Sequence, residues 1–212
     1  MKKIITLTIL LIFISCQERE KPSEISIDFS NNNFSVDGES IYYGASDFKL
    51  ENTSELNITA LELAKQKNFK KARKILLKAL SIEPENPILL NNLGNIEKLS
   101  PNGSNAKKYY EKSFKASDST YLISALNLGI MHFYSGNFDQ SEKLFKYVIS
   151  KTNDNLLIAL SNLELTKIYI DSGKCSDAKK SFRTAEKILN ELNILENILN
   201  NLKINHLNYC QN

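Results

Sequence analysis

From about residue 53 onward, small and large apolar residues recur along the chain with helical spacing and at a nearly constant interval. A small residue opens each set, and a large apolar residue follows it four positions later. Successive sets start 34, 35 and 37 residues apart, at Ala72, Ala106, Ser141 and Ala178. A regular interval of this length is typical of chains built from stacked copies of one supersecondary unit.

Each set is preceded by another segment with helical periodicity. Short polar stretches that contain Gly or Asn, residues suited to positive φ, separate the segment from the set. The preceding segments are residues 56–65, 90–99, 125–134 and 162–171. Gly94 and Gly129 stand where the two helices of a unit must approach closely. The pattern predicts four helix–turn–helix units, at 53–86, 87–120, 122–155 and 159–192.

These units resemble the tetratricopeptide repeat, a helix–turn–helix motif of about thirty-four residues. The resemblance covers about two thirds of the chain. It implies an all-α fold, a right-handed superhelical solenoid of about four units. It leaves the function open, because one fold of this kind serves very many partners.

In this repeat family, the first helices of the units form a concave face that binds extended peptides. The resemblance places amide and apolar side chains there, and amides both donate and accept hydrogen bonds along a peptide backbone. The alternative for the apolar members is a place in the core. The predicted groove residues are Asn57, Leu61, Asn91, Asn92, Asn95, Ile123, Leu126, Asn127, Ile130, Tyr134, Leu163, Glu164 and Lys167.

Residues 193–212 are predicted to form a capping helix and a tail, because apolar residues continue at helical spacing from Ile194 to Leu207. No strong helix breaker follows Lys187. One long helix that continues the fourth unit is therefore the alternative.

Two cysteines distinguish these alternatives. A cap that folds back could bring Cys175 and Cys210 close enough to form a disulfide, whereas a straight helix would separate them by roughly 50 Å. An exported chain is exposed to oxidising conditions, in which disulfides persist. A bridge between Cys175 and Cys210 and a pair of free thiols both stay open.

The first sixteen residues have the layout of a signal peptide. Lys2 and Lys3 precede an apolar run from Ile4 to Ile14. As a helix this run is roughly 16 Å long, about half the ~30 Å hydrocarbon core of a bilayer. Its end resembles the lipobox of bacterial lipoproteins. The resemblance implies removal of residues 1–15 and attachment of lipid, including palmitate, to Cys16; the alternative is ordinary secretion with Cys16 unmodified.

Residues 16–52 are predicted to form an acidic, largely extended tether. The net charge is −5 over residues 17–52 and +6 over residues 53–212. Short alternating segments at 25–29 and 34–36 permit a small hairpin. Residues 25–48 either belong to a loose linker or dock on the repeat body as an internal ligand. A basic cluster at 65–78 is either an ordinary soluble helix face or a patch for this leader or for lipid phosphates.

Composition argues against most other functions. The chain has 24% charged residues, a formal net charge of +3, two His and three Cys. It contains no phosphate-loop, dinucleotide, hydrolase, zinc or CxxC motif. His132 is expected in the core or at a turn. We therefore expect no catalytic residues, no metal, no cofactor and no nucleic-acid partner.

The sequence thus predicts a lipid-anchored scaffold of the bacterial cell envelope, on the outer membrane, that binds a protein or peptide in its groove. Small tetratricopeptide lipoproteins of envelope assembly systems are similar in plan. The alternative is a lipoprotein that captures a ligand beside an outer-membrane transporter. No residue pattern identifies the partner or the side of the membrane that the protein faces.

Overall fold

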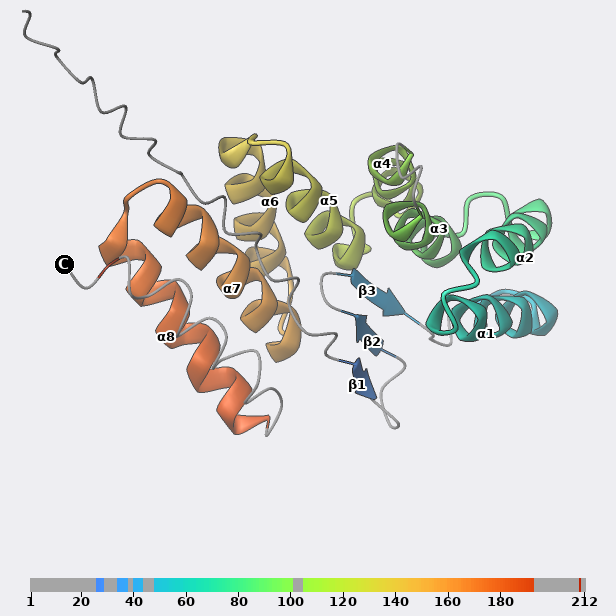
Figure 1. Ribbon diagram of the computed structural model, residues 1–212, viewed down its shortest axis with the longest axis horizontal. Helices are drawn as coiled ribbons and strands as arrows, with labels where there is room; N and C mark the ends of the chain where they lie inside the picture. Colours follow the sequence, from blue (N-terminus) through green and yellow to red (C-terminus); the bar gives the residue numbers. More distant parts are fainter. Residues whose placement is uncertain are drawn as a thin grey trace, which may run out of the picture.

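The computed structural model describes residues 26–28, 34–37, 40–43, 48–100, 105–192 and 210, the strands by their backbone only. Eight helices form the repeat body (Figure 1). They are α1 (Glu51–Lys65), α2 (Phe69–Ile82), α3 (Pro87–Leu99), α4 (Ala106–Ala116), α5 (Leu122–Tyr134), α6 (Phe138–Lys151), α7 (Asn155–Asp171) and α8 (Cys175–Glu191). Each odd-numbered helix packs on the even-numbered helix after it, and each pair packs on the next. The predicted all-α solenoid of four units is confirmed.

Glycines let the two helices of a unit approach each other in the middle of the body. A Cβ atom added at Gly94 of α3 would lie 2.5 Å from Tyr110 Cε1 of α4. The equivalent Cβ at Gly129 of α5 would lie 2.6 Å from Phe145 Cε1 of α6. Real non-bonded carbons stay about 3.5 Å or more apart. The aromatic ring therefore occupies the space that a side chain on the glycine would need.

The small residues that open each set lie in the interior of the body. Ala72, Ala106, Ser141 and Ala178 are all fully buried. Ser141 satisfies its hydroxyl by donating a hydrogen bond to the backbone oxygen of Gly129, at 2.7 Å. A small polar residue can therefore replace alanine at this position without leaving a buried group unpaired.

Capping residues set where two of the first helices begin. The side chain of Asn86 accepts hydrogen bonds from the backbone N–H groups of Ile88 and Leu89 at the start of α3. Asp154 does the same for Leu156 and Leu157 at the start of α7. Because Asp154 caps the helix, α7 begins at Asn155, four residues before the boundary that the repeat spacing predicts.

Positive φ angles occur in the turns within units, but glycine supplies only some of them. Gly136 and Gly173 have φ of 74° and 70°. In the first unit the residue with positive φ is Lys67, at 59°, whereas the neighbouring Asn68 has φ −87°. The expectation that Gly or Asn would take this conformation holds for the third and fourth units and is wrong for the first.

Three short antiparallel strands precede the helices: β1 (Ser26–Asp28), β2 (Phe34–Asp37) and β3 (Ser40–Tyr43). β1 pairs with β2, which is the hairpin that the alternating segments permit, and β2 pairs with β3. The sheet lies inside the arc of helices, and β3 contacts α3 and α5 (Figure 1).

At the other end of the chain, Cys210 lies against the start of α8. The Cα atoms of Cys175 and Cys210 are 5.3 Å apart, and their sulfur atoms are joined in a disulfide. A single straight helix through residue 210 is therefore wrong, and the chain returns after α8 ends at Glu191. The predicted capping helix from residue 193, like the signal peptide and Cys16, lies outside the described residues.

Candidate functional site: the inner face of the helical arc

The inner face is the surface formed by α1, α3, α5 and α7. These helices contact one another in series along the arc. The predicted groove residues all belong to them. The structure therefore places the set on four successive first helices, and β3 lies against the middle two, α3 and α5.

Four asparagines from three helices form a chain of amide hydrogen bonds, called here the amide ladder. Asn127 of α5 donates through Nδ2 to Asn91 Oδ1 of α3, at 2.9 Å. Asn91 donates to Asn92 Oδ1 over a longer 3.4 Å. Asn92 donates to Asn57 Oδ1 of α1, at 2.9 Å. All four are buried, so the ladder connects the first three units through hydrogen bonds inside the body.

The ladder ends in an unused donor. Asn57 is fully buried, and its Nδ2 atom has no hydrogen-bond partner among the residues that the structure describes. A buried donor without a partner costs about 1–3 kcal/mol. Asn95, the other predicted amide of α3, accepts a hydrogen bond from the Tyr110 hydroxyl at 2.7 Å and so also fixes the ring that fills the space beside Gly94.

The apolar members of the predicted set lie deeper than a groove lining. Ile123, Leu126 and Ile130 of α5 belong to the hydrophobic core that α5 shares with α6 and α7. Leu163 of α7 is buried in a smaller cluster with α8. The alternative that some of these residues are core is the one that the structure supports.

The remaining members are more accessible. Leu61 of α1 is half-buried. Lys167 of α7 donates to Glu164 Oε1 at 2.7 Å, and both side chains keep partial exposure. Tyr134, the last residue of α5, is 49% exposed, and the Lys98 ammonium lies 6.0 Å from its ring.

Glu83, the residue after α2, contacts the residues that lead into α1. Its carboxylate accepts hydrogen bonds from the Leu50 N–H at 3.2 Å and from Asn86 Nδ2 at 2.9 Å. Burial alone would raise the pKa of Glu83, but hydrogen bonds from Asn86, Thr53 and the backbone of Lys49 and Leu50 lower it below its usual value. Glu83 is therefore a structural anion that holds the start of α1.

Other titratable groups with charged or hydrogen-bonding neighbours lie on α5, α6 and α7. Burial, followed by the positive charge of Lys107, lowers the pKa of His132, and Glu111 acts in the opposite sense. Glu142 accepts a hydrogen bond from the Tyr169 hydroxyl at 3.0 Å. Within the described ranges, no group of three or more His, Cys, Asp or Glu side chains could hold a metal ion.

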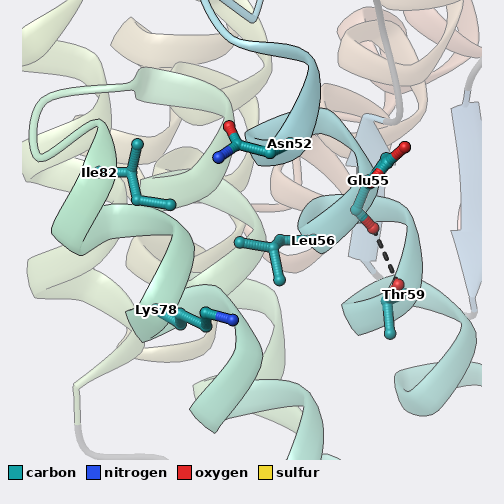
Figure 2. A pocket seen from close by; sticks show the side chains of 6 residues that line it. All are labelled: Asn52, Glu55, Leu56, Thr59, Lys78 and Ile82. Carbon is teal, nitrogen blue, oxygen red and sulfur yellow. Dashed lines mark hydrogen bonds between the residues drawn. The ribbon is translucent and has the colours of Figure 1, made fainter.

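A shallow cavity of about 270 Å³ lies between α1 and α2 (Figure 2). Its lining mixes apolar and polar side chains, and Thr59 donates to the Glu55 backbone oxygen at 2.9 Å rather than to the cavity. The lining residues are Asn52, Glu55, Leu56, Thr59, Lys78 and Ile82. The cavity lies in the first unit, at the end of the stack.

The outer face, formed by α2, α4, α6 and α8, carries a charge pattern that the sequence showed only in part. These helices hold sixteen basic and six acidic side chains, whereas the inner helices hold three basic and six acidic ones. The members of the basic cluster noted at 65–78 that lie on α2 thus share the outer face with the basic residues of α4. The sequence alone does not show this charge difference between the two faces, because it does not say which helices share a face.

No protein-family model matches this chain, and no curated protein matches it. Among solved structures, it is similar to the crystal structure of PilW, described as a widely conserved type IV pilus biogenesis factor. The two chains share 17% identity with a TM-score of 0.48, over 66% of this chain and 79% of the PilW chain. Among the described helices, none is long and apolar enough to cross a membrane.

Proposed function

We propose that this protein is a scaffold of the bacterial envelope, attached to a membrane through lipid on Cys16, that holds an extended segment of a partner protein against its inner face. The proposal assigns no catalytic role and no cofactor to the chain. The anchor rests on the first sixteen residues, and the binding role rests on the inner face.

The observation that carries the binding role is the position of β3. An extended stretch of backbone, Ser40–Tyr43, lies against α3 and α5. The same helices that would receive a partner therefore have the shape to receive an extended chain. The asparagines of these helices are buried and bond within the body, so the side chains that can contact a bound segment include the more accessible Leu61, Tyr134 and Lys167.

The protein's own leader is, in this proposal, the resident ligand. Residues 25–48 occupy the inner face until a partner segment displaces them. Because the leader and the partner compete, the apparent affinity for the partner depends on how tightly the leader binds the inner face. A variant that lacks residues 25–48 should therefore bind a partner more tightly than the complete chain.

The test is in-cell crosslinking, purification from membranes and mass spectrometry of wild type beside three variants. Cys16→Ala should leave the membrane fraction and lose the partner. Tyr134→Ala, an exposed inner-face change, should stay membrane-bound, keep its helical circular dichroism and recover less partner. Asn190→Ala on α8, also exposed, is the matched control and should behave as wild type.

Two results would contradict the proposal. If the Cys16→Ala variant remains in the membrane fraction, the proposed lipid anchor at Cys16 is contradicted. Partner recovery that is equal for wild type and Tyr134→Ala but reduced for Asn190→Ala would place the binding surface on the opposite face. Saturable binding of a small molecule with no protein recovered would favour the ligand-capture alternative.

A further inference from the structure

The first two helices of the outer face form a strongly basic surface. α2 and α4 together carry nine basic side chains and one acidic one, whereas α6 and α8 together carry seven basic and five acidic ones. All of these basic side chains are exposed. The excess positive charge is therefore concentrated at the amino-terminal half of the arc.

Few of these charges are neutralised. Arg73 is paired with Glu97 of α3, at 2.6 Å, and Lys107 lies 3.8 Å from Glu111. In the described part of the chain, no carboxylate lies within ion-pair distance of the remaining basic residues of α2 and α4. These are Lys70, Lys71, Lys74, Lys78, Lys108, Lys112 and Lys115.

The basic surface of α2 also contains an exposed apolar side chain. Lys70, Lys74 and Lys78 recur every four residues and so share one side of the helix. Leu77 lies beside them and is 37% exposed, one of the few large apolar side chains of the described chain that is this open. Lysine with an adjacent exposed leucine suits the headgroup layer of a bilayer, because the ammonium groups meet phosphates and the leucine meets the acyl boundary.

We propose that the outer surface of α2 and α4 docks on a membrane of anionic phospholipid. This inference rests on the proposed anchoring at Cys16, since one lipid attachment combined with a basic patch gives a more stable membrane association than either alone. α1 begins at Glu51, so the tether leads directly to the basic end of the arc. Docking by the outer face turns the inner face away from the bilayer and leaves it open to partners.

The experiment uses the mature chain, residues 16–212, with Cys16→Ser, so that neither the apolar run at 4–14 nor acylation contributes, and vesicles of phosphatidylcholine with or without phosphatidylglycerol. An α2 variant carries Lys70→Gln, Lys71→Gln, Lys74→Gln and Lys78→Gln. A control variant on α8 removes the same charge through Lys179→Gln, Lys180→Gln, Arg183→Gln and Lys187→Gln. All changed side chains of the two helices are exposed, so both variants should keep the wild-type circular dichroism.

The Cys16→Ser chain with all its lysines should bind anionic vesicles more tightly than neutral ones. Each lysine near such a membrane contributes roughly a fivefold factor, so the α2 variant should lower the partition coefficient about a hundredfold or more. The α8 control should change it several-fold at most, and raised salt should weaken all binding. Equal loss in the two variants, or equal binding to neutral and anionic vesicles, would overturn the proposal. Absence of cosedimentation with the lysines intact would also overturn it and would assign them to the acidic leader instead.

Because the Cys16→Ser chain cannot be acylated, the vesicle result does not depend on whether the cell lipidates Cys16. Loss of membrane attachment by Cys16→Ala in cells tests the anchor, and the paired vesicle variants test the outer surface. If the anchor proposal fails, the docking of the outer surface can still be tested, and the reverse also holds.

Discussion

Replacing Gly129 with alanine should destabilise the protein, although the same change stabilises an exposed helix. The added Cβ would lie 2.6 Å from Phe145 Cε1, 2.9 Å from Cζ and 3.1 Å from Cδ1. Carbon atoms in contact rest about 3.5–4.0 Å apart, so the ring edge has to retreat by about 1 Å. Phe145 is fully buried, and a packed interior has no free volume on the far side of the ring.

Two opposing effects decide the magnitude. Overpacking a core typically costs about 1–3 kcal/mol, whereas alanine is better than glycine inside a helix by about 1 kcal/mol. Because the clash involves a fully buried ring edge, its cost should lie in the upper part of that range, about 2–3 kcal/mol, and the net loss in the free energy of unfolding should be about 1–2 kcal/mol. For a chain of this size, that lowers Tm by roughly 2–8 °C.

Thermal and urea unfolding followed by circular dichroism measure the change, and a second substitution tests its cause. Phe145→Leu shortens the side chain that the new methyl group meets. The double variant should therefore lose less than the sum of the single losses, by about 1 kcal/mol or more. Gly94→Ala should be at least as harmful, since the hydrogen bond to Asn95 holds the Tyr110 ring in place. A Gly129→Ala protein with a raised Tm would refute the close-packing argument.

Two further outcomes follow from the ends of the repeat body. The lowered pKa of Glu83 means that its contribution to stability is present above its unfolded pKa, near 4.5, and is lost as the pH falls through the lower folded value. Glu83→Gln should flatten this acid limb of the urea midpoint, and an unchanged limb would show that other carboxylates cause it. The Cys175–Cys210 bridge spans 35 residues, so the Cys175→Ser, Cys210→Ser double variant should be less stable by about 3–4 kcal/mol at most. Alkylation of both thiols in protein unfolded without a reductant would show that the bridge is not formed.

Much of the fold follows from a few residues. The recurring small residues, together with Gly94 and Gly129, predict the units because the cost of a larger side chain there is steric and local. The repeat interval misplaces the start of α7, although Asp154 before an apolar run is a helix-capping signal. A repeat interval marks equivalent positions, and the cap decides where the helix begins.

The candidate site is less predictable. The sequence indicates that asparagines gather on one face, but not that they bond to one another, since Asn92 and Asn57 are 35 residues apart and meet only after two units stack. The core positions of Ile123 and Ile130 are likewise left open by the sequence, because α5 is apolar on nearly every side. The basic outer face requires knowing which helices share a face.

The disulfide has a mechanical consequence. A stack whose units contact only their neighbours comes apart from its ends, and the link between Cys175 and Cys210 closes one end. Force applied through the leader enters at α1, which the hydrogen bond from Leu50 to Glu83 attaches to the end of the second helix of its unit. Under tension the units should therefore peel off one after another from α1 toward α8, so that the molecule lengthens in steps and the last unit yields last.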